Sequence, residues 1–284
     1  MAQAARFRDL MRRNGMVVAP GAYDCITARL IERAGFDAVY MTGAGTAATL
    51  GYPDFGIVTM SEMVANGGRI AAAVDVPVIA DADTGYGNEL NVVRTVREYE
   101  TVGVAGIHIE DQGFPKKCGH LDDKEIVPRE DWLAKIRAAV AARRERDFMV
   151  IARTDARAVA GFDEAVGRAN DAIAAGADMA FVEAPQTMEE VAAVPRLVKG
   201  PCLLNVVHGG KTPEVDLGEV EQMGYKLAIV PGMLIKNVVG ICEQMLGELA
   251  ATRRHPAPVR EMTVRETFNL WGADEWDALR TRFR

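Results

Sequence analysis

Carboxylates that could bind a cation end two short apolar runs of this 284-residue sequence. Asp81 and Asp83 end the run 76–83, and Glu110 ends an apolar run that follows Gly103. Three carboxylates brought together would repel one another, and a bound cation would relieve that repulsion. Oxygen ligands favour Mg²⁺ or Mn²⁺ over zinc, so these residues predict a magnesium site. The alternative is that they cap loops or form surface ion pairs.

A second group of reactive side chains lies in the stretch KKCGH (116–120). The positive charge of two lysines and a histidine is expected to favour the thiolate form of Cys118, and a thiol–thiolate couple can carry protons near neutral pH. An isolated stretch of this kind is also compatible with an ordinary surface loop. The other three cysteines are expected to pack in the core: Cys25, Cys202 and Cys242.

Two further segments carry groups that could bind an anion. Arg153 offers a planar guanidinium that matches a carboxylate, although a salt bridge to Asp155 or Glu183 would explain it equally well. The glycine-rich loop 42–46 exposes backbone N–H groups that could also bind an anion. His108 lies inside an apolar run, and we expect it to be a core histidine rather than a ligand.

The elements that must position these groups alternate along the chain. An amphipathic helix, a glycine and a short apolar run recur together, with the glycines at positions that suit the end of a helix: Gly35, Gly103, Gly176 and Gly224. Further apolar runs bring the total to about eight strands, whose near-continuous hydrophobicity is typical of buried parallel strands; these runs cover 16–20, 76–83, 148–155 and 201–207. Helical patterns cover 89–101, 129–144, 163–175, 216–223 and 233–252.

Strand–helix alternation over the whole chain predicts an α/β fold, specifically a (β/α)8 TIM barrel. A doubly wound open sheet is the alternative, but no G-x-G-x-x-G follows the first apolar run. The carboxyl ends of barrel strands meet at one face, where active sites are built. The residues expected there are Thr42, Asp81, Asp83, Glu110, Asp111, Arg153, Asp155, Glu183, Asn205 and Pro231.

The chain is predicted to be a single barrel domain, 1–284, in which 253–284 form a C-terminal helical arm. The arm carries large apolar side chains, among them Trp271 and Trp276. It either caps this chain's own barrel or packs on a neighbouring subunit, because two tryptophans are a large apolar surface to expose to water.

Composition narrows the classes of function. The 40 acidic and 33 basic residues give a net charge of −7, which disfavours a nucleic-acid partner. Four cysteines in a chain of this length do not form a disulfide framework and fit a reduced, cytoplasmic protein. No membrane-spanning or secretory segment is evident, and the arginine-rich start is expected to form a short amphipathic helix.

Several motifs occur in one order along the chain: GAYD (21–24), TGAG (42–45), GYPDFG (51–56), IADADTGYG (79–87), HIEDQ (108–112), KKCGH (116–120), IARTDA (151–156) and N-x-x-x-G-G-K-T-P (205–213). Together they resemble the isocitrate lyase / phosphoenolpyruvate mutase superfamily over most of the chain. KKCGH is similar to the lyase branch, which includes 2,3-dimethylmalate lyase, methylisocitrate lyase and oxaloacetate hydrolase. The phosphonomutase branch has a different loop at this place.

The resemblance implies a Mg²⁺-dependent barrel, with Mn²⁺ as the alternative ion. Asp81 and Asp83 would bind the metal directly or through water, together with Glu110 and with Asp54 on a gating loop. The resemblance also implies a homotetramer, a dimer of helix-swapped dimers that exchange a C-terminal helix.

The resemblance implies roles for the remaining site residues as well. Cys118 would be the acid–base residue on a mobile loop, supported by His120. The carboxylate of an α-oxo acid would be bound by Thr42, Gly43, Ala44 and Arg153. Further positions lining the pocket would be Gly119, Glu183, Asn205, His208 and Lys236.

Four of these positions depart from the commonest lyase pattern. Thr42 and Ala44 stand where a serine and a glycine are usual in methylisocitrate lyase, and the TGAG form looks more like the dimethylmalate lyase and oxaloacetate hydrolase branches. His208 takes the place of a glutamate. Lys236 lies near the arginine that binds the distal carboxylate in members that cleave tricarboxylates. These changes bear on the substrate more than on the reaction type.

The implied activity is that of an oxo-acid lyase, which cleaves a carbon–carbon bond in a small carboxylate. The leading substrates are 2,3-dimethylmalate and 2-methylisocitrate types, releasing pyruvate or glyoxylate plus a carboxylate. Tyr40 and Glu183 are the candidates for the base that deprotonates the hydroxyl. An oxaloacetate decarboxylase or hydrolase is the first alternative, followed by a phosphonomutase and a non-catalytic, metabolite-binding barrel.

Overall fold

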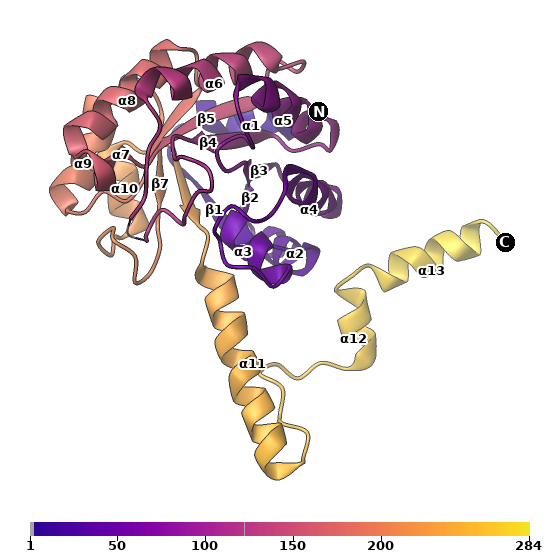
Figure 1. Cartoon of the computed structure of the whole chain (residues 1–284). Coiled ribbons are helices and arrows are strands. Elements are labelled where there is room, and N and C mark those ends of the chain that lie inside the picture. The colour runs from indigo at the N-terminus through magenta and orange to yellow at the C-terminus, as the bar shows by residue number, and fades with distance from the viewer. Residues whose placement is uncertain (1–2, 122) are drawn as a thin grey trace. The chain divides into compact units, whose positions relative to one another are not determined.

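A closed barrel of eight parallel strands forms the framework of the chain (Figure 1). The computed structural model describes residues 3–121 and 123–284. Strands follow one another around the barrel in chain order, and the first closes it by pairing with the last, where Val17 lies opposite Leu227. Their bounds are β1 (Val17–Ala22), β2 (Val39–Met41), β3 (Val78–Asp81), β4 (Gly106–Glu110), β5 (Met149–Thr154), β6 (Met179–Val182), β7 (Cys202–Asn205) and β8 (Leu227–Val230). The predicted (β/α)8 TIM barrel is confirmed.

Helices alternate with these strands. Their bounds are α1 (Gln3–Arg12), α2 (Cys25–Arg33), α3 (Gly43–Thr49), α4 (Met60–Ala73), α5 (Glu89–Thr101), α6 (Arg129–Ala142), α7 (Ala156–Val159), α8 (Phe162–Ala174), α9 (Met188–Leu197), α10 (Leu217–Met223), α11 (Met233–Thr252), α12 (Val264–Asn269) and α13 (Ala273–Arg282). The five helices predicted between 89 and 252 are present as α5, α6, α8, α10 and α11. The glycine-rich stretch 42–46, expected to be a loop, instead begins α3. Thr42 caps that helix by accepting a hydrogen bond from the Gly45 N–H at 3.3 Å, which is why the helix starts there.

Side chains fill the inside of the barrel. Tyr40, Ile151 and Phe181 belong to this inner cluster, and α1 adds Phe7 and Leu10 to it. Cluster members such as Ala38 and Ala105 precede their strands, so α1 closes the amino-terminal end of the barrel. The carboxyl end is therefore the end at which a site can be built.

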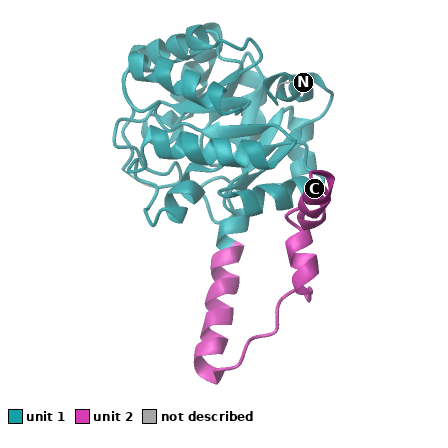
Figure 2. Cartoon of the chain, turned by 90° about the vertical axis from the view of Figure 1, so that its right-hand side faces the viewer, with its two compact units in different colours: residues 1–236 teal, residues 237–284 magenta. Residues whose placement is uncertain are grey.

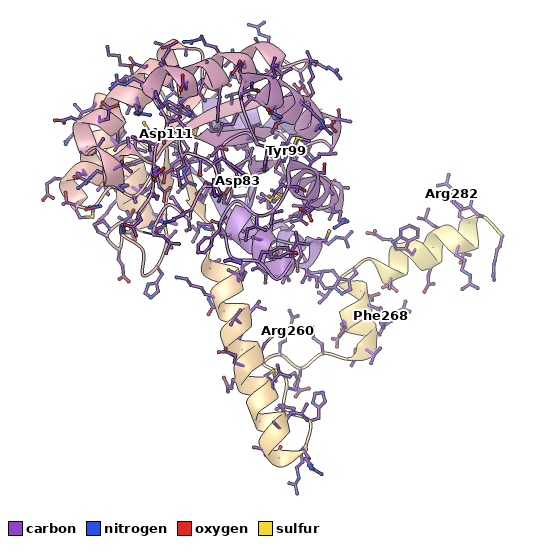
Figure 3. All side chains as sticks on the ribbon, in the orientation of Figure 1. Asp83, Tyr99, Asp111, Arg260, Phe268 and Arg282 are labelled. Atoms are coloured by element: carbon purple, nitrogen blue, oxygen red, sulfur yellow. The ribbon has the colours of Figure 1, made fainter. Side chains whose placement is uncertain are left out.

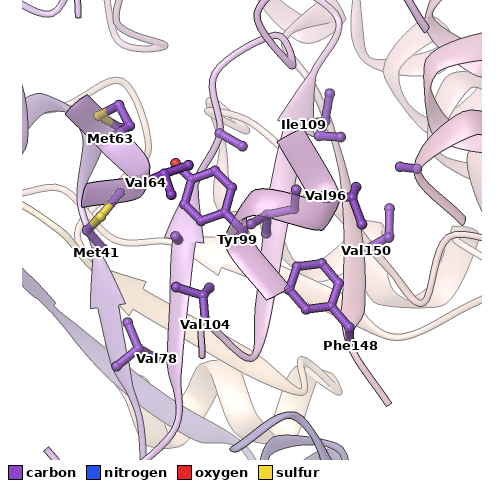
Figure 4. Packing of buried hydrophobic residues seen from close by; sticks show 14 of the residues in the cluster. Met41, Met63, Val64, Val78, Val96, Tyr99, Val104, Ile109, Phe148 and Val150 are labelled. Carbon is purple, nitrogen blue, oxygen red and sulfur yellow. The ribbon is translucent and has the colours of Figure 1, made fainter. Parts of the chain in front are cut away.

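A second cluster packs between the strands and the outer helices. Tyr99 on α5 is fully buried within it, among Met63, Val64 and Val96 (Figure 4). Its hydroxyl donates a hydrogen bond to the backbone carbonyl of Asp81 at 2.9 Å. The outer core thereby fixes the backbone at the end of β3, where one of the predicted metal ligands lies.

The chain divides into two compact units, one reaching Lys236 and the other comprising Asn237–Arg284 (Figure 2). The division falls inside α11, whereas the sequence placed the start of the arm at residue 253. In the second unit, the side chains of Phe268 (Figure 3) and Trp276 are 60% and 71% exposed. Within 3–121 and 123–284, no helix is long and apolar enough to cross a membrane. The single-domain assignment and the helix exchange stay predictions.

Candidate active site

The carboxyl ends of the strands place most of the predicted site residues in one buried region. Asp81 ends β3, Glu110 ends β4, and Arg153 lies opposite Glu110 in the β4–β5 register. Figure 3 shows Asp83, just past β3, inside the barrel unit. Each residue of the group is less than a tenth exposed; the group comprises Thr42, Asp81, Asp83, Glu110, Arg153, Glu183 and Asn205.

Lys116 lies between two of the predicted metal-binding carboxylates. Its Nζ lies 2.5 Å from Asp54 Oδ1 and 2.8 Å from Asp83 Oδ1, and its side chain is buried. Burial lowers the pKa of Lys116, but the surrounding carboxylates raise it further, so the pKa stays well above its ordinary value and the group is cationic. The stretch KKCGH placed Lys116 near Cys118 but did not indicate that Lys116 would bind carboxylates.

Asp83 and Glu110 are buried, and the neighbouring cations and hydrogen-bond donors do not fully balance their negative charge. Burial raises the pKa of Asp83 to about 6; Lys116 opposes this rise, and the charge of Asp81 adds to it. Glu110 is fully buried, and neither of its carboxylate oxygens accepts a hydrogen bond from the described residues. Arg153 Nη1 contacts Glu110 Oε2 only as an ion pair, at 3.2 Å. Burial also raises the pKa of Glu110 well above its ordinary value.

The segment between β4 and α6 carries Cys118 and is called the Cys118 loop (111–121 and 123–128). It docks on the ends of β6 and β7 through His120. His120 Nε2 lies 3.0 Å from Glu183 Oε1, and Nδ1 accepts a hydrogen bond from the Lys211 backbone N–H at 3.0 Å. Because Nδ1 accepts, a neutral His120 carries its proton on Nε2 and donates it to Glu183. Asn205 Nδ2 donates to the same carboxylate at 3.2 Å. His120, Glu183 and Asn205 therefore form one group.

Arg153 is fixed by its neighbours on several sides. Its Nε lies 2.9 Å from Asp155 Oδ2, and its guanidinium carbon lies 5.2 Å from the centroid of the Phe181 ring. A Cβ atom added at Gly119 would lie 2.4 Å from Arg153 Nη2 and 2.7 Å from Glu183 Cγ. The salt bridge to Asp155 that the sequence left open is thus present, and the backbone of the Cys118 loop also packs directly against Arg153.

The ionisation of Cys118 differs from the expectation. Its side chain is partly buried, and burial raises the pKa of the thiol above its ordinary value, although a backbone hydrogen bond from His120 opposes the rise. The neighbouring lysines face elsewhere: Lys116 binds carboxylates, and Lys117 Nζ donates to the backbone carbonyl of Asp123 at 3.1 Å. The thiolate prediction is wrong. Cys118 is a protonated thiol at neutral pH, the form that can donate a proton.

The rate at which iodoacetamide alkylates Cys118 is expected to rise with a midpoint above about pH 8.5, the ordinary value for a cysteine. Only the thiolate reacts, so a raised pKa moves the profile to higher pH. Peptide mass spectrometry across a pH series measures the midpoint. Cys118 in the urea-unfolded chain is the control, and a folded-state midpoint below the unfolded one would contradict the raised pKa.

His108 packs inside the barrel, as expected for a core histidine. Its ring stacks on Tyr40, with centroids 5.8 Å apart, and meets Phe181 edge-on at 5.5 Å. Its Nε2 lies 2.9 Å from the Tyr40 hydroxyl and 3.7 Å from Asp81 Oδ1, while its Nδ1 has no hydrogen-bond partner among the described residues. Burial lowers the pKa of His108 to about 4, so the ring is neutral. Burial also raises the pKa of Tyr40 well above its ordinary value, with Asp81 adding to the rise, so this hydroxyl stays protonated.

His208 and Lys236, which were predicted to lie in the distal part of the pocket, contact other residues at its exposed rim. His208 is 85% exposed and pairs with Glu214 at 2.9 Å. Lys236 Nζ donates to the backbone carbonyl of His208 at 2.5 Å. Of the cysteines assigned to the core, Cys202 is buried, Cys25 is only partly buried, and Cys242 is exposed on α11, a helix with no buried residues.

Comparison with known proteins places the chain in a family. A family model described as phosphoenolpyruvate phosphomutase matches residues 7–250. The chain belongs to this family. Within the phosphoenolpyruvate phosphomutase family it is 53% identical over 232 residues to 2,3-dimethylmalate lyase of Eubacterium barkeri, covering 81% of this chain and 80% of that protein. It is 46% identical over 242 residues to 2-methylisocitrate lyase of Aeropyrum pernix, covering 85% and 78%.

Solved structures agree with this assignment. A crystal structure of 2,3-dimethylmalate lyase superposes with a TM-score of 0.94 at 40% identity, over 99% of this chain and 95% of that one. Oxaloacetate acetylhydrolase in complex with 3,3-difluorooxalacetate superposes with a TM-score of 0.94 at 36% identity, over 98% and 96%. A phosphonopyruvate hydrolase, solved as a complex with oxalate and Mg²⁺, gives 0.90 at 30% identity, over 100% and 99%.

The charge of the phosphomutase-family site fits a divalent cation. No group of three or more histidine, cysteine, aspartate and glutamate side chains within 3–121 and 123–284 has the spacing to bind a metal as the side chains stand. Lys116 lies between Asp54 and Asp83, so metal binding there requires it to move. Carboxylates nevertheless outnumber cations among the buried and nearly buried groups: Asp54, Asp81, Asp83, Glu110, Asp111, Asp155 and Glu183 against Lys116, Lys124, Arg153 and Arg168. A divalent ion would relieve this excess.

Proposed function

We propose that this protein is a carbon–carbon lyase that cleaves a substituted 2-hydroxy dicarboxylate or tricarboxylate between C2 and C3. The observation that carries the proposal is the docking of the Cys118 loop. The docked loop places Gly119 against Arg153 and Glu183. These residues lie next to buried carboxylates that outnumber the buried cations and include Glu110, which accepts no hydrogen bond from the described residues. This packing supports the roles proposed for one site: Cys118 as the proton donor, Arg153 as the carboxylate ligand and the buried carboxylates as the cation ligands. The similarity to dimethylmalate and methylisocitrate lyases supports the same reaction class.

The metal site of the proposal is formed by Asp81, Asp83, Glu110 and Asp54. All supply oxygen ligands, which suits Mg²⁺, with Mn²⁺ as the alternative ion. When bound, the ion stabilises negative charge that develops on the substrate oxygens. The phosphonopyruvate hydrolase complex with Mg²⁺ supports this choice of ion.

The substrate carboxylate is assigned to Arg153 and to the start of α3. A Cβ atom at Gly43 would lie 2.4 Å from Asp81 Oδ2, so the backbone at the start of α3 lies directly against the Asp81 side chain. Glycine is required there because any side chain would collide. This proximity supports the assignment of Thr42, Gly43, Ala44 and Arg153 to the α-oxo acid carboxylate.

Cleavage requires a base for the C2 hydroxyl. Tyr40 stays protonated in this environment, which favours Glu183 of the two candidates, acting directly or through a water. Loss of the hydroxyl proton forms the C2 carbonyl of the α-oxo acid while the C2–C3 bond breaks. The electron pair of that bond passes to C3 as an enediolate of the second carboxylate. Cys118 then donates its thiol proton to C3, with His120 holding the loop on Glu183.

The rim of the site favours a dicarboxylate of the 2,3-dimethylmalate type over a tricarboxylate. His208 is turned to solvent and Lys236 binds a backbone carbonyl, so neither presents a cation to a distal carboxylate. With 2,3-dimethylmalate the products are pyruvate and propionate. Oxaloacetate decarboxylation or hydrolysis is the second candidate, favoured by the match to oxaloacetate acetylhydrolase.

A substrate panel tests the proposal. The protein is incubated with Mg²⁺ and 2,3-dimethylmalate, 2-methylisocitrate or oxaloacetate; α-oxo acids are detected with phenylhydrazine, and oxaloacetate loss is followed separately. We expect pyruvate from 2,3-dimethylmalate at a higher kcat/KM than from 2-methylisocitrate. Turnover of oxaloacetate alone would establish the second candidate, and no turnover of any compound would contradict both.

Gly119→Ala is expected to lower kcat/KM by roughly a hundredfold, because small misplacements of catalytic groups carry penalties of that order. The new methyl group would collide with Arg153 and Glu183. Gly113→Ala is the matched control on the same loop, since its nearest neighbour would lie 3.9 Å away. Steady-state kinetics of both variants measure the difference; equal activities would show that Gly119 does not pack on the site.

The proposal also includes a homotetrameric assembly and a cytoplasmic location. The exposed side chains of Phe268 and Trp276 support a homotetramer built from helix-swapped dimers. The four cysteines are all free, which supports a reducing, cytoplasmic location. Light scattering of the purified chain, with and without residues 253–284, tests the assembly.

A further inference from the structure

Lys124 is a buried lysine that joins the Cys118 loop to the end of β5. Its side chain is only 1% exposed. Its Nζ donates a hydrogen bond to the backbone carbonyl of Gly119 and another to Asp155 Oδ1, the latter at 2.7 Å. Lys124 therefore bridges the residue next to Cys118 and a carboxylate at a strand end.

Asp155 also binds Arg153. Its Oδ2 accepts from Arg153 Nε at 2.9 Å, and its Oδ1, which Lys124 binds, also accepts from Arg153 Nη2 at 3.3 Å. The backbone N–H of Asp155 donates to Asp111 Oδ1 at 2.7 Å, which fixes the carboxylate relative to β4. Although burial raises the pKa of Asp155, Arg153 and Lys124 hold it below its ordinary value, so the group is ionised.

Arg153 also contacts the Cys118 loop directly. The Gly119 backbone lies so close to Arg153 Nη2 that a Cβ atom would approach it to 2.4 Å. Gly119, Lys124, Asp155 and Arg153 consequently form a closed ring of contacts. Within that ring, Lys124 is the only cationic side chain that belongs to the loop.

We propose that Lys124 is a positioning residue that fastens the Cys118 loop to Asp155, so that docking of the loop and the orientation of Arg153 depend on each other. The catalytic part of this inference rests on the proposed lyase function. Without the ammonium group, the Gly119 carbonyl and Asp155 Oδ1 lose a charged donor in a buried place, and the undocked loop becomes more populated.

Site-resolved alkylation tests the proposal without requiring turnover. Lys124→Met keeps an unbranched side chain that is one atom shorter and removes its charge. Iodoacetamide alkylation of Cys118 is expected to accelerate about tenfold to a hundredfold in this variant, the range for losing hydrogen bonds to a charged group. Lys226→Met is the matched control, because Lys226 Nζ also donates to backbone carbonyls but precedes β8, at the opposite end of the barrel.

Cys202, buried in β7, reports whole-chain opening in the same experiment. Faster labelling of Cys118 with unchanged Cys202 supports the proposal. Parallel acceleration of both cysteines would overturn it, because Lys124 would then stabilise the fold in general; unchanged Cys118 would overturn it as well. Lys124→Arg keeps a cationic donor and should fall closer to the wild type than Lys124→Met, and equal rates in the two variants would contradict the role of the charge.

Kinetics extend the test to catalysis. Lys124→Met is expected to lower kcat about tenfold or more, in parallel with the alkylation change. A variant with accelerated Cys118 labelling but wild-type kcat would overturn the link between loop docking and catalysis. A wild-type protein without lyase activity, whose Cys118 labelling still depends on Lys124, would contradict only the proposed function.

Discussion

Cys118→Ser is expected to lower the rate of carbon–carbon cleavage by roughly a hundredfold to ten-thousandfold, the range associated with a positioned acid–base group. Cys118 is the side chain on the docked loop whose pKa suits proton donation. A serine hydroxyl is nearly the same size but is a far weaker acid, so the loop can dock while the carbanion is left unprotonated. Steady-state kinetics with 2,3-dimethylmalate measure the loss.

Ligand binding separates this effect from damage to the site. Arg153, not Cys118, is assigned to the carboxylate, so the affinity of Cys118→Ser for oxalate in the presence of Mg²⁺ should stay close to that of the wild type. Calorimetry measures it. Cys25→Ser, which alters a partly buried cysteine on α2, is the control and should retain full activity. Full lyase activity in Cys118→Ser would rule out the thiol as the proton donor.

Asp83→Ala is expected to remove activity, by roughly a hundredfold or more, because a group that stabilises developing charge is lost. Asp83 belongs to the carboxylate group, and its Oδ1 lies 2.8 Å from Lys116 Nζ. Its removal takes away a proposed metal ligand and leaves Asp54 as the ion-pair partner of Lys116. The affinity for Mn²⁺, followed by electron paramagnetic resonance of the free ion, should fall together with the activity.

Asp75→Ala is the matched control for the metal site. Asp75 is an exposed aspartate that precedes β3, so it lies at the other end of the barrel from Asp83. Its loss should change neither Mn²⁺ affinity nor turnover. An Asp83→Ala variant that remains active and indifferent to added metal would contradict the assignment of the carboxylates to a cation.

The barrel could be predicted from the sequence because parallel, doubly covered strands leave a strong signal. Stretches such as 148–152 and 201–204 are apolar throughout, and a polar residue follows each of them, Arg153 and Asn205. Once the strands are parallel, their carboxyl ends must meet at one face. Asp81, Glu110 and Arg153 could therefore be placed together without knowledge of any contact.

The ionisation of the site could not be predicted, because it depends on burial and on which neighbours the side chains face. KKCGH suggested a thiolate, but Lys116 turns to Asp54 and Asp83, and burial raises the pKa of Cys118. Lys124 stands in a charged, loop-like stretch of sequence, with no local indication that its ammonium group would be buried.

The directions in which exposed side chains point also could not be predicted from the sequence. His208 occupies a motif position that the resemblance assigns to the pocket, yet its side chain is turned to solvent and pairs with Glu214. Cys242 lies on an apolar helical pattern that predicts a core, but α11 exposes it. The pattern reports the hydrophobicity of a helix face and does not report which surface covers it.

Cleavage of 2,3-dimethylmalate in D₂O tests the lyase function most directly. The proposed reaction breaks the C2–C3 bond and protonates C3, so NMR should show pyruvate and propionate in equal amounts, with one deuterium at C2 of the propionate. Cys118→Ser should form neither product at a comparable rate. Conversion of oxaloacetate to oxalate and acetate, without any pyruvate and propionate from 2,3-dimethylmalate, would contradict the lyase function.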